Sequence, residues 1–340
     1  MKEKFAAPHI PSVFVGKPKN YPDQLPWKEV KRRFSQLMGK FYPPSTPLKL
    51  KVTGETRLQG NIIKQRVEYF VEPGEEVAAF HLFRKDIPRD APGILSIHAH
   101  GGGICFVQGK EMHCSPEPGD PKQYTYRMAL EGFRVLAPDA LCFGERRTAW
   151  GYSTEFFDEI NRHMELTARG KSLCWKSVWD NSRAIEVLEL LGARTIGSVG
   201  LSGGSTQNYI LASINKRIKA AVCFASFATL RHQFYRYRLA HCLYHFIPGM
   251  IAEGIDWDQV VALAAPRKFL FCTGAKDEGT PEPMIRAFVN AINRRCREEK
   301  LPQSVWVCRE PEAGHEITEK MMRRAVLFFR THLQAKNNPL

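Results

Sequence analysis

A serine with glycines on both sides is the residue of this chain best placed to do chemistry. Ser202 lies in the segment 200–204, Gly-Leu-Ser-Gly-Gly, which matches the pattern G-x-S-x-G. The apolar run at 196–200 predicts a buried strand, and residues 205–214 predict a helix. A tight turn between strand and helix exposes the serine hydroxyl at the end of a sheet, and the glycines let other backbone approach it. We therefore predict that Ser202 is a nucleophile.

A histidine and an aspartate further along the chain complete a set of three. A serine hydroxyl is a weak nucleophile and needs a base. His315 follows the apolar run at 304–308, and Asp277 directly follows the run at 268–272. An aspartate bonded to the imidazole would hold it in the tautomer that accepts the serine proton. We predict His315 as base and Asp277 as acid, with Glu278 as the alternative acid.

The negative oxygen that forms during acyl transfer needs two backbone donors. The N–H of Gly203, directly after the serine, is the first. The second is expected in the loop His-Ala-His-Gly-Gly-Gly at 98–103. Either the His100 N–H is this donor, or the loop is read as an HGGG motif and the donor is Gly101 or Gly102. We favour the first register, because His98 directly follows the strand predicted at 93–97.

Histidines in this loop also suggest a competing metal site. His98 and His100, joined by His113 and Cys114, carry side chains that bind metals, but no usual ligand spacing is completed. We therefore expect no metal.

Two further groups are candidates for contact with substrate. Glu145 and Arg146 follow a predicted strand, although a buried structural ion pair is the favoured alternative for them. Tyr235 and Tyr237 belong to an aromatic and basic insertion.

Strands and helices alternate along most of the chain. Residues 48–83 alternate polar and apolar positions, as antiparallel strands do. From the continuous apolar run at 93–97 onward, buried strands alternate with helical segments such as 124–131 and 175–191. This pattern predicts an α/β fold with a mostly parallel central sheet and helices on both faces. In such sheets the loops after the strands surround the ligand crevice.

The expected organisation is one large domain with additions. Residues 1–50 form an N-terminal extension with one amphipathic helix at 27–38, which either packs on the domain or joins copies of the chain into a homo-oligomer. Residues 51–335 form the α/β domain, residues 227–258 a small helical cap over the pocket, and residues 336–340 a tail.

Composition bears on the cellular location of the protein and on the kind of partner that it binds. The chain of 340 residues is 44% hydrophobic, and no run of about 18 apolar residues or secretory signal is present, so a cytoplasmic location without membrane contact is expected. Nine cysteines without a C-x-x-C pair indicate reduced thiols. The formal charge of +14 is spread in short groups, which predicts no nucleic-acid partner and is compatible with an anionic or aromatic small substrate.

Six motifs together resemble the α/β-hydrolase superfamily, within it the dienelactone-hydrolase-like and acetyl-xylan-esterase-like group. They are 98–102 (His-Ala-His-Gly-Gly), 136–146, 179–184, 200–204, 264–267 and Gly314-His315. The resemblance covers about residues 50–335. It implies Ser202, Asp277 and His315 as the catalytic set, in the chain order of α/β-hydrolases, with an acyl-enzyme and without a metal or organic cofactor.

Two departures from this group refine the expectation. Dienelactone hydrolases use a cysteine nucleophile where Ser202 stands here, which favours esterase chemistry, and Ala99 replaces a glycine. We therefore expect a serine hydrolase that cleaves a carboxylic ester of a small or medium-sized substrate. The alternatives are the same set acting on an amide, peptide, lactone or carbon–carbon bond, and a non-catalytic binding protein on the same fold.

Overall fold

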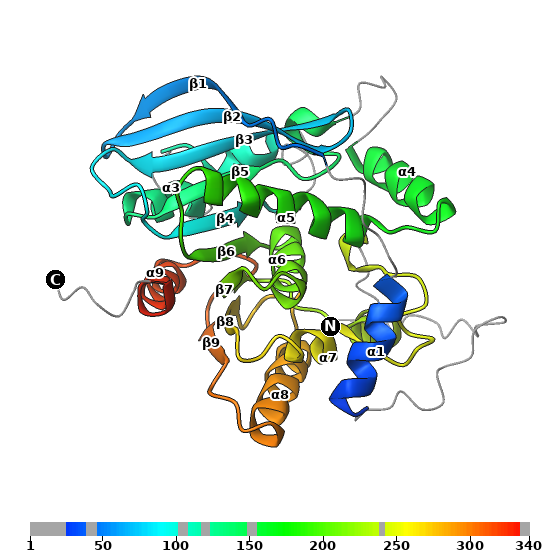
Figure 1. Ribbon diagram of the computed structural model, residues 1–340. Helices are drawn as coiled ribbons and strands as arrows, with labels where there is room; N and C mark the ends of the chain where they lie inside the picture. The colour runs from blue at the N-terminus through cyan, green and yellow to red at the C-terminus, as the bar shows by residue number, and fades with distance from the viewer. Residues whose placement is uncertain are drawn as a thin grey trace, which may run out of the picture.

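A nine-stranded sheet runs through the part of the chain that the structure describes (Figure 1). The computed structural model describes residues 25–38, 46–100, 108–116, 123–147, 155–237 and 242–333. The strands are β1 (Lys51–Leu58), β2 (Ile62–Glu72), β3 (Glu75–Arg84), β4 (Gly93–Ile97), β5 (Arg134–Pro138), β6 (Ile196–Leu201), β7 (Ile218–Phe224), β8 (Lys268–Gly274) and β9 (Val305–Glu310). Their order across the sheet is β1-β2-β3-β5-β4-β6-β7-β8-β9.

The sheet has an antiparallel part and a parallel part. The pairs β1–β2, β2–β3 and β3–β5 are antiparallel, whereas β5, β4, β6, β7, β8 and β9 are all parallel to one another. Every residue of β4, β5 and β6 is buried. Strands covered on both faces need no polar side, which explains why their sequences are continuous apolar runs. The predicted mostly parallel sheet is confirmed.

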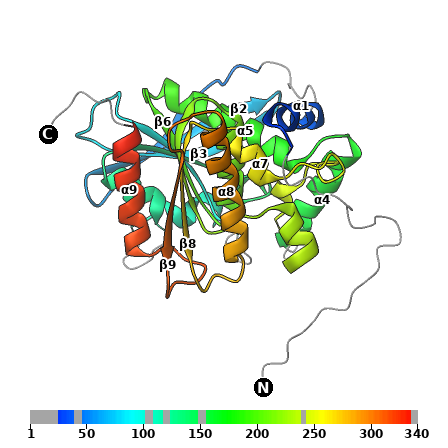
Figure 2. The same ribbon diagram turned by 90° about the horizontal axis from the view of Figure 1, so that it is seen from below.

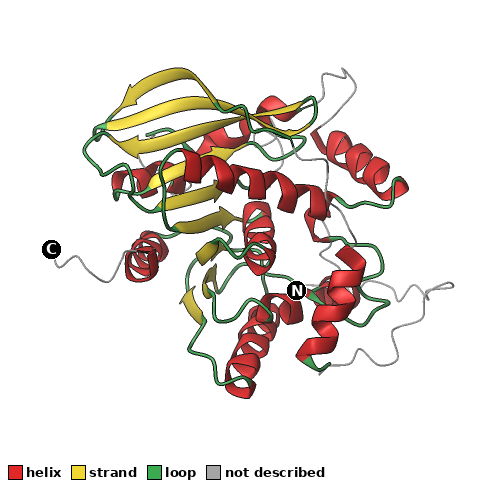
Figure 3. Cartoon of the chain, viewed as in Figure 1, coloured by secondary structure: helices red, strands yellow, loops and turns green. Residues whose placement is uncertain are grey.

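Helices cover both faces of the sheet, as Figures 2 and 3 show. They are α1 (Trp27–Met38), α3 (Tyr124–Leu130), α4 (Glu155–Ala168), α5 (Leu173–Leu190), α6 (Gly203–Ile214), α7 (Trp257–Ala262), α8 (Glu282–Glu298) and α9 (Glu319–Leu333). Side chains from α3 and α9 form one core with the sheet, and α1, α5, α6, α7 and α8 contribute to the other.

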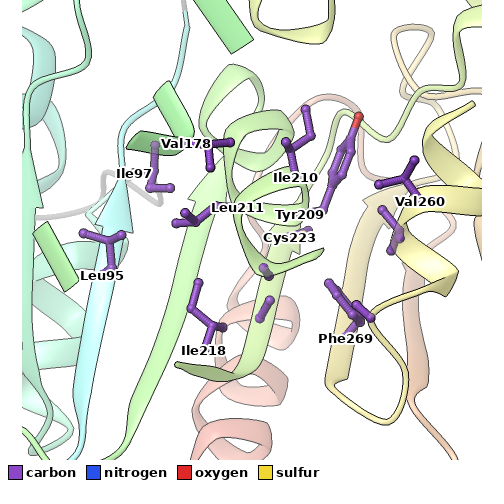
Figure 4. Packing of buried hydrophobic residues seen from close by; sticks show 14 of the residues in the cluster. Leu95, Ile97, Val178, Tyr209, Ile210, Leu211, Ile218, Cys223, Val260 and Phe269 are labelled. Atoms are coloured by element: carbon purple, nitrogen blue, oxygen red, sulfur yellow. The ribbon is translucent and has the colours of Figure 1, made fainter. Parts of the chain in front are cut away.

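Alternate residues of each central strand enter the two cores. Leu95 and Ile97 of β4 belong to the core with α5 and α6, and Ile94 belongs to the core with α9. Figure 4 shows Leu95 and Ile97 in the first core together with Tyr209 and Leu211 of α6. The helix α6, which directly follows Ser202, is therefore packed firmly on the sheet.

The predicted amphipathic helix at 27–38 is present as α1. It packs on the main domain: the rings of Phe34 and Trp257 meet edge to face at 6.1 Å, and the Trp27 indole N–H donates to Glu298 at 2.6 Å. The homo-oligomer expected through the extension stays a prediction.

The insertion at 227–258 contains only short helical turns among its described residues, at His232–Tyr237 and Leu243–His245, before α7 begins. Sequence patterns did not reveal α4, α7 or α8. Within the described ranges, no helix combines the length and apolar character needed to cross a membrane. The described cysteines all have free thiols.

Candidate active site

Ser202 occupies the turn between β6 and α6, where the sequence predicts a nucleophile. Its φ of 55° and ψ of −119° are unfavourable for a residue with a side chain, and such strain is typical of functional turns. Hydrogen bonds fix the turn: the Ser202 N–H donates to the Phe224 carbonyl of β7 at 2.9 Å, and the Thr206 N–H donates to the Ser202 carbonyl at 3.0 Å.

The three predicted residues form one chain of hydrogen bonds. His315 Nε2 lies 2.9 Å from Ser202 Oγ, and His315 Nδ1 lies 3.0 Å from Asp277 Oδ2. Asp277 and Ser202 are buried, whereas 45% of the His315 side chain is exposed. Asp277 and His315 meet because β8 and β9 are parallel neighbours, so the loops that follow them leave the same edge of the sheet.

The Asp277 carboxylate receives several donors besides His315. The Gly279 N–H donates to Oδ1 at 2.9 Å, and the Thr280 hydroxyl donates as well. Burial acts to raise the pKa of Asp277, but the His315 hydrogen bond and charge together with these donors outweigh it, so the pKa lies below its usual value. Asp277 is thus held as a carboxylate. The alternative acid Glu278 is exposed. The structure places Asp277 against His315 instead.

Gly203 and His100 lie against each other beside Ser202. A Cβ built on Gly203 would lie 2.0 Å from the His100 Cβ, so only glycine allows this approach. The next residue is equally confined, because a Cβ on Gly204 would lie 2.3 Å from the Ile97 carbonyl oxygen. The backbone after β4 and the start of α6 therefore meet where the two oxyanion donors are predicted.

In the loop after β4, the amide just before His100 already has a hydrogen-bond partner. The Ala99 N–H donates to His113 Nε2 at 3.2 Å, so this amide is engaged away from the serine. Gly101 and Gly102, the donors of the alternative register, lie outside the described residues. The His100 Cβ lies beside Gly203, and the choice between the two registers stays a prediction.

His98 and His113 bind backbone rather than each other. The Ala140 N–H donates to His98 Nε2 at 2.9 Å, and His98 Nδ1 donates to the Ala99 carbonyl at 2.9 Å. Burial lowers the pKa of His98, so it stays neutral at neutral pH. In the described ranges, no three His, Cys, Asp or Glu side chains are grouped to hold a metal ion. His98 thereby joins the segment after β4 to the loop after β5, whereas His113 joins two parts of the segment between β4 and α3.

Arg146 lies in a network of buried charges. Its guanidinium donates to Asp180 at 2.8 Å, to Glu75, and to the Asp139 carbonyl at 3.2 Å, and 6% of the side chain is exposed. Such contacts are those of a buried structural ion pair, which the sequence analysis favoured over substrate contact for Arg146.

Glu145 also forms ion pairs. Lys110 donates to its Oε1 at 2.7 Å, and Arg66 donates to its Oε2 at 2.5 Å. The Lys110 ammonium reaches the buried Asp139 carboxylate as well, at 2.5 Å. Contact of Glu145 and Arg146 with substrate stays a prediction, and it would compete with these pairs. The side chains of Tyr235 and Tyr237 lie outside the described residues, so their role stays a prediction too.

Sequence patterns gave no role near this site to Thr280 or Glu159, which contact Asp277 and His100 respectively. They offered His113 only as a metal ligand, whereas it binds the Ala99 amide. The proximity of Thr280 to Asp277 along the chain was a usable signal, but Glu159 and His100 are 59 positions apart.

Comparison with known proteins identifies the fold. No protein-family model and no curated protein sequence matches the chain. A solved structure from Bacteroides fragilis, assigned as an acetyl xylan esterase, is 16% identical over 92% of this chain and 83% of its own, with a TM-score of 0.63. A glucuronoyl esterase from Solibacter usitatus is 13% identical over 92% and 91%, with a TM-score of 0.61. A Klebsiella pneumoniae protein assigned as a dienelactone hydrolase is 15% identical over 83% and 99%, with a TM-score of 0.51. Taken with the strand order and directions of the sheet, these similarities show that this chain has the α/β-hydrolase fold.

Proposed function

We propose that this protein is a serine hydrolase that cleaves carboxylic esters through an acyl-enzyme on Ser202. The observation that carries the proposal is the unbroken hydrogen-bond chain from Ser202 through His315 to Asp277, at the ends of three parallel strands. The esterase names of the structurally similar proteins support an ester as the substrate.

The reaction follows from the positions of these groups. Ser202 Oγ attacks the ester carbonyl carbon while His315 Nε2 takes its proton, and Asp277 stabilises the imidazolium. The negative oxygen of the tetrahedral intermediate accepts hydrogen bonds from the Gly203 and His100 N–H groups. When the carbon–oxygen bond breaks, His315 gives the proton to the leaving alcohol. Water then attacks the acyl-enzyme by the same route and releases the acid.

Labelling with a fluorophosphonate probe tests the nucleophile. We expect wild type and Ser213→Ala to be labelled, because Ser213 lies in the same helix but donates its hydroxyl to the Tyr209 carbonyl. Ser202→Ala should remain unlabelled and should lose ester hydrolysis by at least about 10³-fold. Equal labelling of Ser202→Ala would contradict the proposal, and an unlabelled wild type would favour a non-catalytic binding protein.

A substrate panel tests the bond that is cleaved. We propose that p-nitrophenyl esters are hydrolysed faster than aminoacyl amides and lactones, because the neighbours that share the fold are named esterases. The panel should contain anionic acyl groups, which the charge of +14 favours, and aromatic acyl groups, which the aromatic residues of the insertion suggest. Turnover of amides or lactones without turnover of any ester would move the proposal to the corresponding bond.

A further inference from the structure

We propose that Glu159 of α4 positions the oxyanion site through His100. Glu159 binds the His100 imidazole, and His100 supplies a backbone N–H beside Ser202. This inference rests on the proposed function, and it gives α4 a role in placing one of the two oxyanion donors.

The contact between Glu159 and His100 is short and buried. His100 Nε2–H donates to Glu159 Oε2 at 2.5 Å, and the two side chains are 6% and 0% exposed. The other carboxyl oxygen, Oε1, has no hydrogen-bond partner among the described residues. A buried carboxylate needs donors to offset the loss of water, so the His100 N–H dominates the placement of this side chain.

His100 in turn has little freedom to move. Its ring centre lies 5.4 Å from that of Phe143 and 6.5 Å from that of Tyr244, which meets it edge to face. The Tyr244 hydroxyl is bonded to the Leu141 carbonyl at 2.8 Å, which holds that ring in place. The imidazole is thus packed on its sides and hydrogen-bonded at its tip.

A fixed imidazole fixes the backbone that carries it. The His100 Cβ lies 2.0 Å from the place that a Cβ on Gly203 would take, and the preceding amide is bound by His113. A displaced His100 side chain would therefore move the backbone donor relative to Gly203. Donors to a developing oxyanion act mainly in the transition state, so a shift of this amide should lower kcat more than it changes KM.

Three variants of α4 test the proposal in the full chain. Glu159→Leu removes the acceptor of the His100 Nε2–H, and Glu159→Gln keeps an acceptor of the same shape. Glu165→Gln alters a partly exposed residue of the same helix that pairs with Arg162. We measure kcat and KM for a p-nitrophenyl ester, and the inhibition constant of a trifluoromethyl ketone. This ketone adds to Ser202 and forms a tetrahedral oxyanion.

For Glu159→Leu we expect kcat to fall about 10- to 100-fold with KM within about twofold, and the ketone to bind more weakly by the same factor. Glu159→Gln should stay within about threefold of wild type, and Glu165→Gln should match it. Thermal unfolding of each variant monitors the fold, and the parallel loss of ketone affinity separates positioning from general damage.

Other outcomes overturn the proposal. They are an unchanged kcat in Glu159→Leu, a rise in KM without loss of ketone affinity, or a Glu159→Gln variant as impaired as Glu159→Leu. Fluorophosphonate labelling of wild type keeps the two proposals apart. A labelled, ester-cleaving wild type with any of these results defeats the role of Glu159 alone, whereas an unlabelled and inactive wild type defeats the proposed function and this inference with it.

Discussion

Asp277 shows how one residue depends on several neighbours. Its carboxylate accepts hydrogen bonds from His315, Gly279 and Thr280. The Thr280 Oγ1 in turn accepts a hydrogen bond from the Ser226 N–H at 2.7 Å. Ser226 itself has a positive φ of 59°. The end of β7 is thereby connected to the acid that follows β8, and His315 is oriented by a carboxylate that is itself held in place.

Replacing Asp277 with Asn tests this orientation. An amide cannot stabilise the imidazolium and can favour the wrong imidazole tautomer, so we expect kcat for ester hydrolysis to fall by about 10³- to 10⁴-fold. Glu278→Gln is the matched control, because this exposed neighbour was the alternative acid. A large loss in Glu278→Gln with activity retained in Asp277→Asn would reverse the assignment.

Three structural elements meet in the charge network around Arg146. Glu75 lies at the start of β3, Arg146 follows β5, and Lys176 and Asp180 lie on α5. Lys176 donates to Glu75 at 2.7 Å and to Asp180 at 2.6 Å. Burial works against the charged form of Arg146, but Asp180 and Glu75 outweigh this and raise the pKa of Arg146. Together these charges connect the antiparallel part of the sheet to α5, the helix before β6.

The variant Arg146→Met separates a structural from a substrate role. Removal of the Arg146 guanidinium leaves Lys176 as the remaining cation on Glu75 and Asp180, so we expect the free energy of unfolding to fall by about 1–3 kcal/mol. The exposed neighbour Arg147→Met should change it by less than about 0.5 kcal/mol. Urea unfolding measures both. A raised KM with unchanged stability in Arg146→Met would instead show that Arg146 binds substrate.

Across the whole molecule, buried neutral histidines limit stability in acid. Burial, and to a lesser extent the charge of Arg134, lowers the pKa of His81 from 6.5 to about 3, and burial lowers the pKa of His98 as well. The unfolded chain takes up these protons below about pH 6.5 while the folded chain does not. The contribution of His81 to stability is therefore fully present above pH 6.5 and is lost as the pH falls toward 3, and the contribution of His98 has the same sign.

Urea unfolding between pH 7.5 and 4.5 measures this loss. We expect His81 to contribute a fall of about 1.4 kcal/mol per pH unit to the free energy of unfolding of wild type below pH 6. His81→Gln should have a slope smaller by that amount for one histidine, because glutamine does not titrate. Parallel profiles of wild type and His81→Gln would contradict the role of His81.

The sequence by itself determined the sheet and the three central residues of the site. Apolar runs mark the strands β6, β8 and β9, and Ser202, Asp277 and His315 each follow one of them. Parallel strands end at one edge of a sheet, so this placement along the chain already brings the three residues together in space.

Only the tertiary structure decided which other side chains serve the site. Glu159 is a charged residue that local sequence patterns cannot distinguish from a surface residue, and it is buried against a partner from a distant segment. Glu159 meets His100 from 59 positions away. The free energy of a buried charge depends on such partners, which the spacing of residues along a strand or helix does not encode.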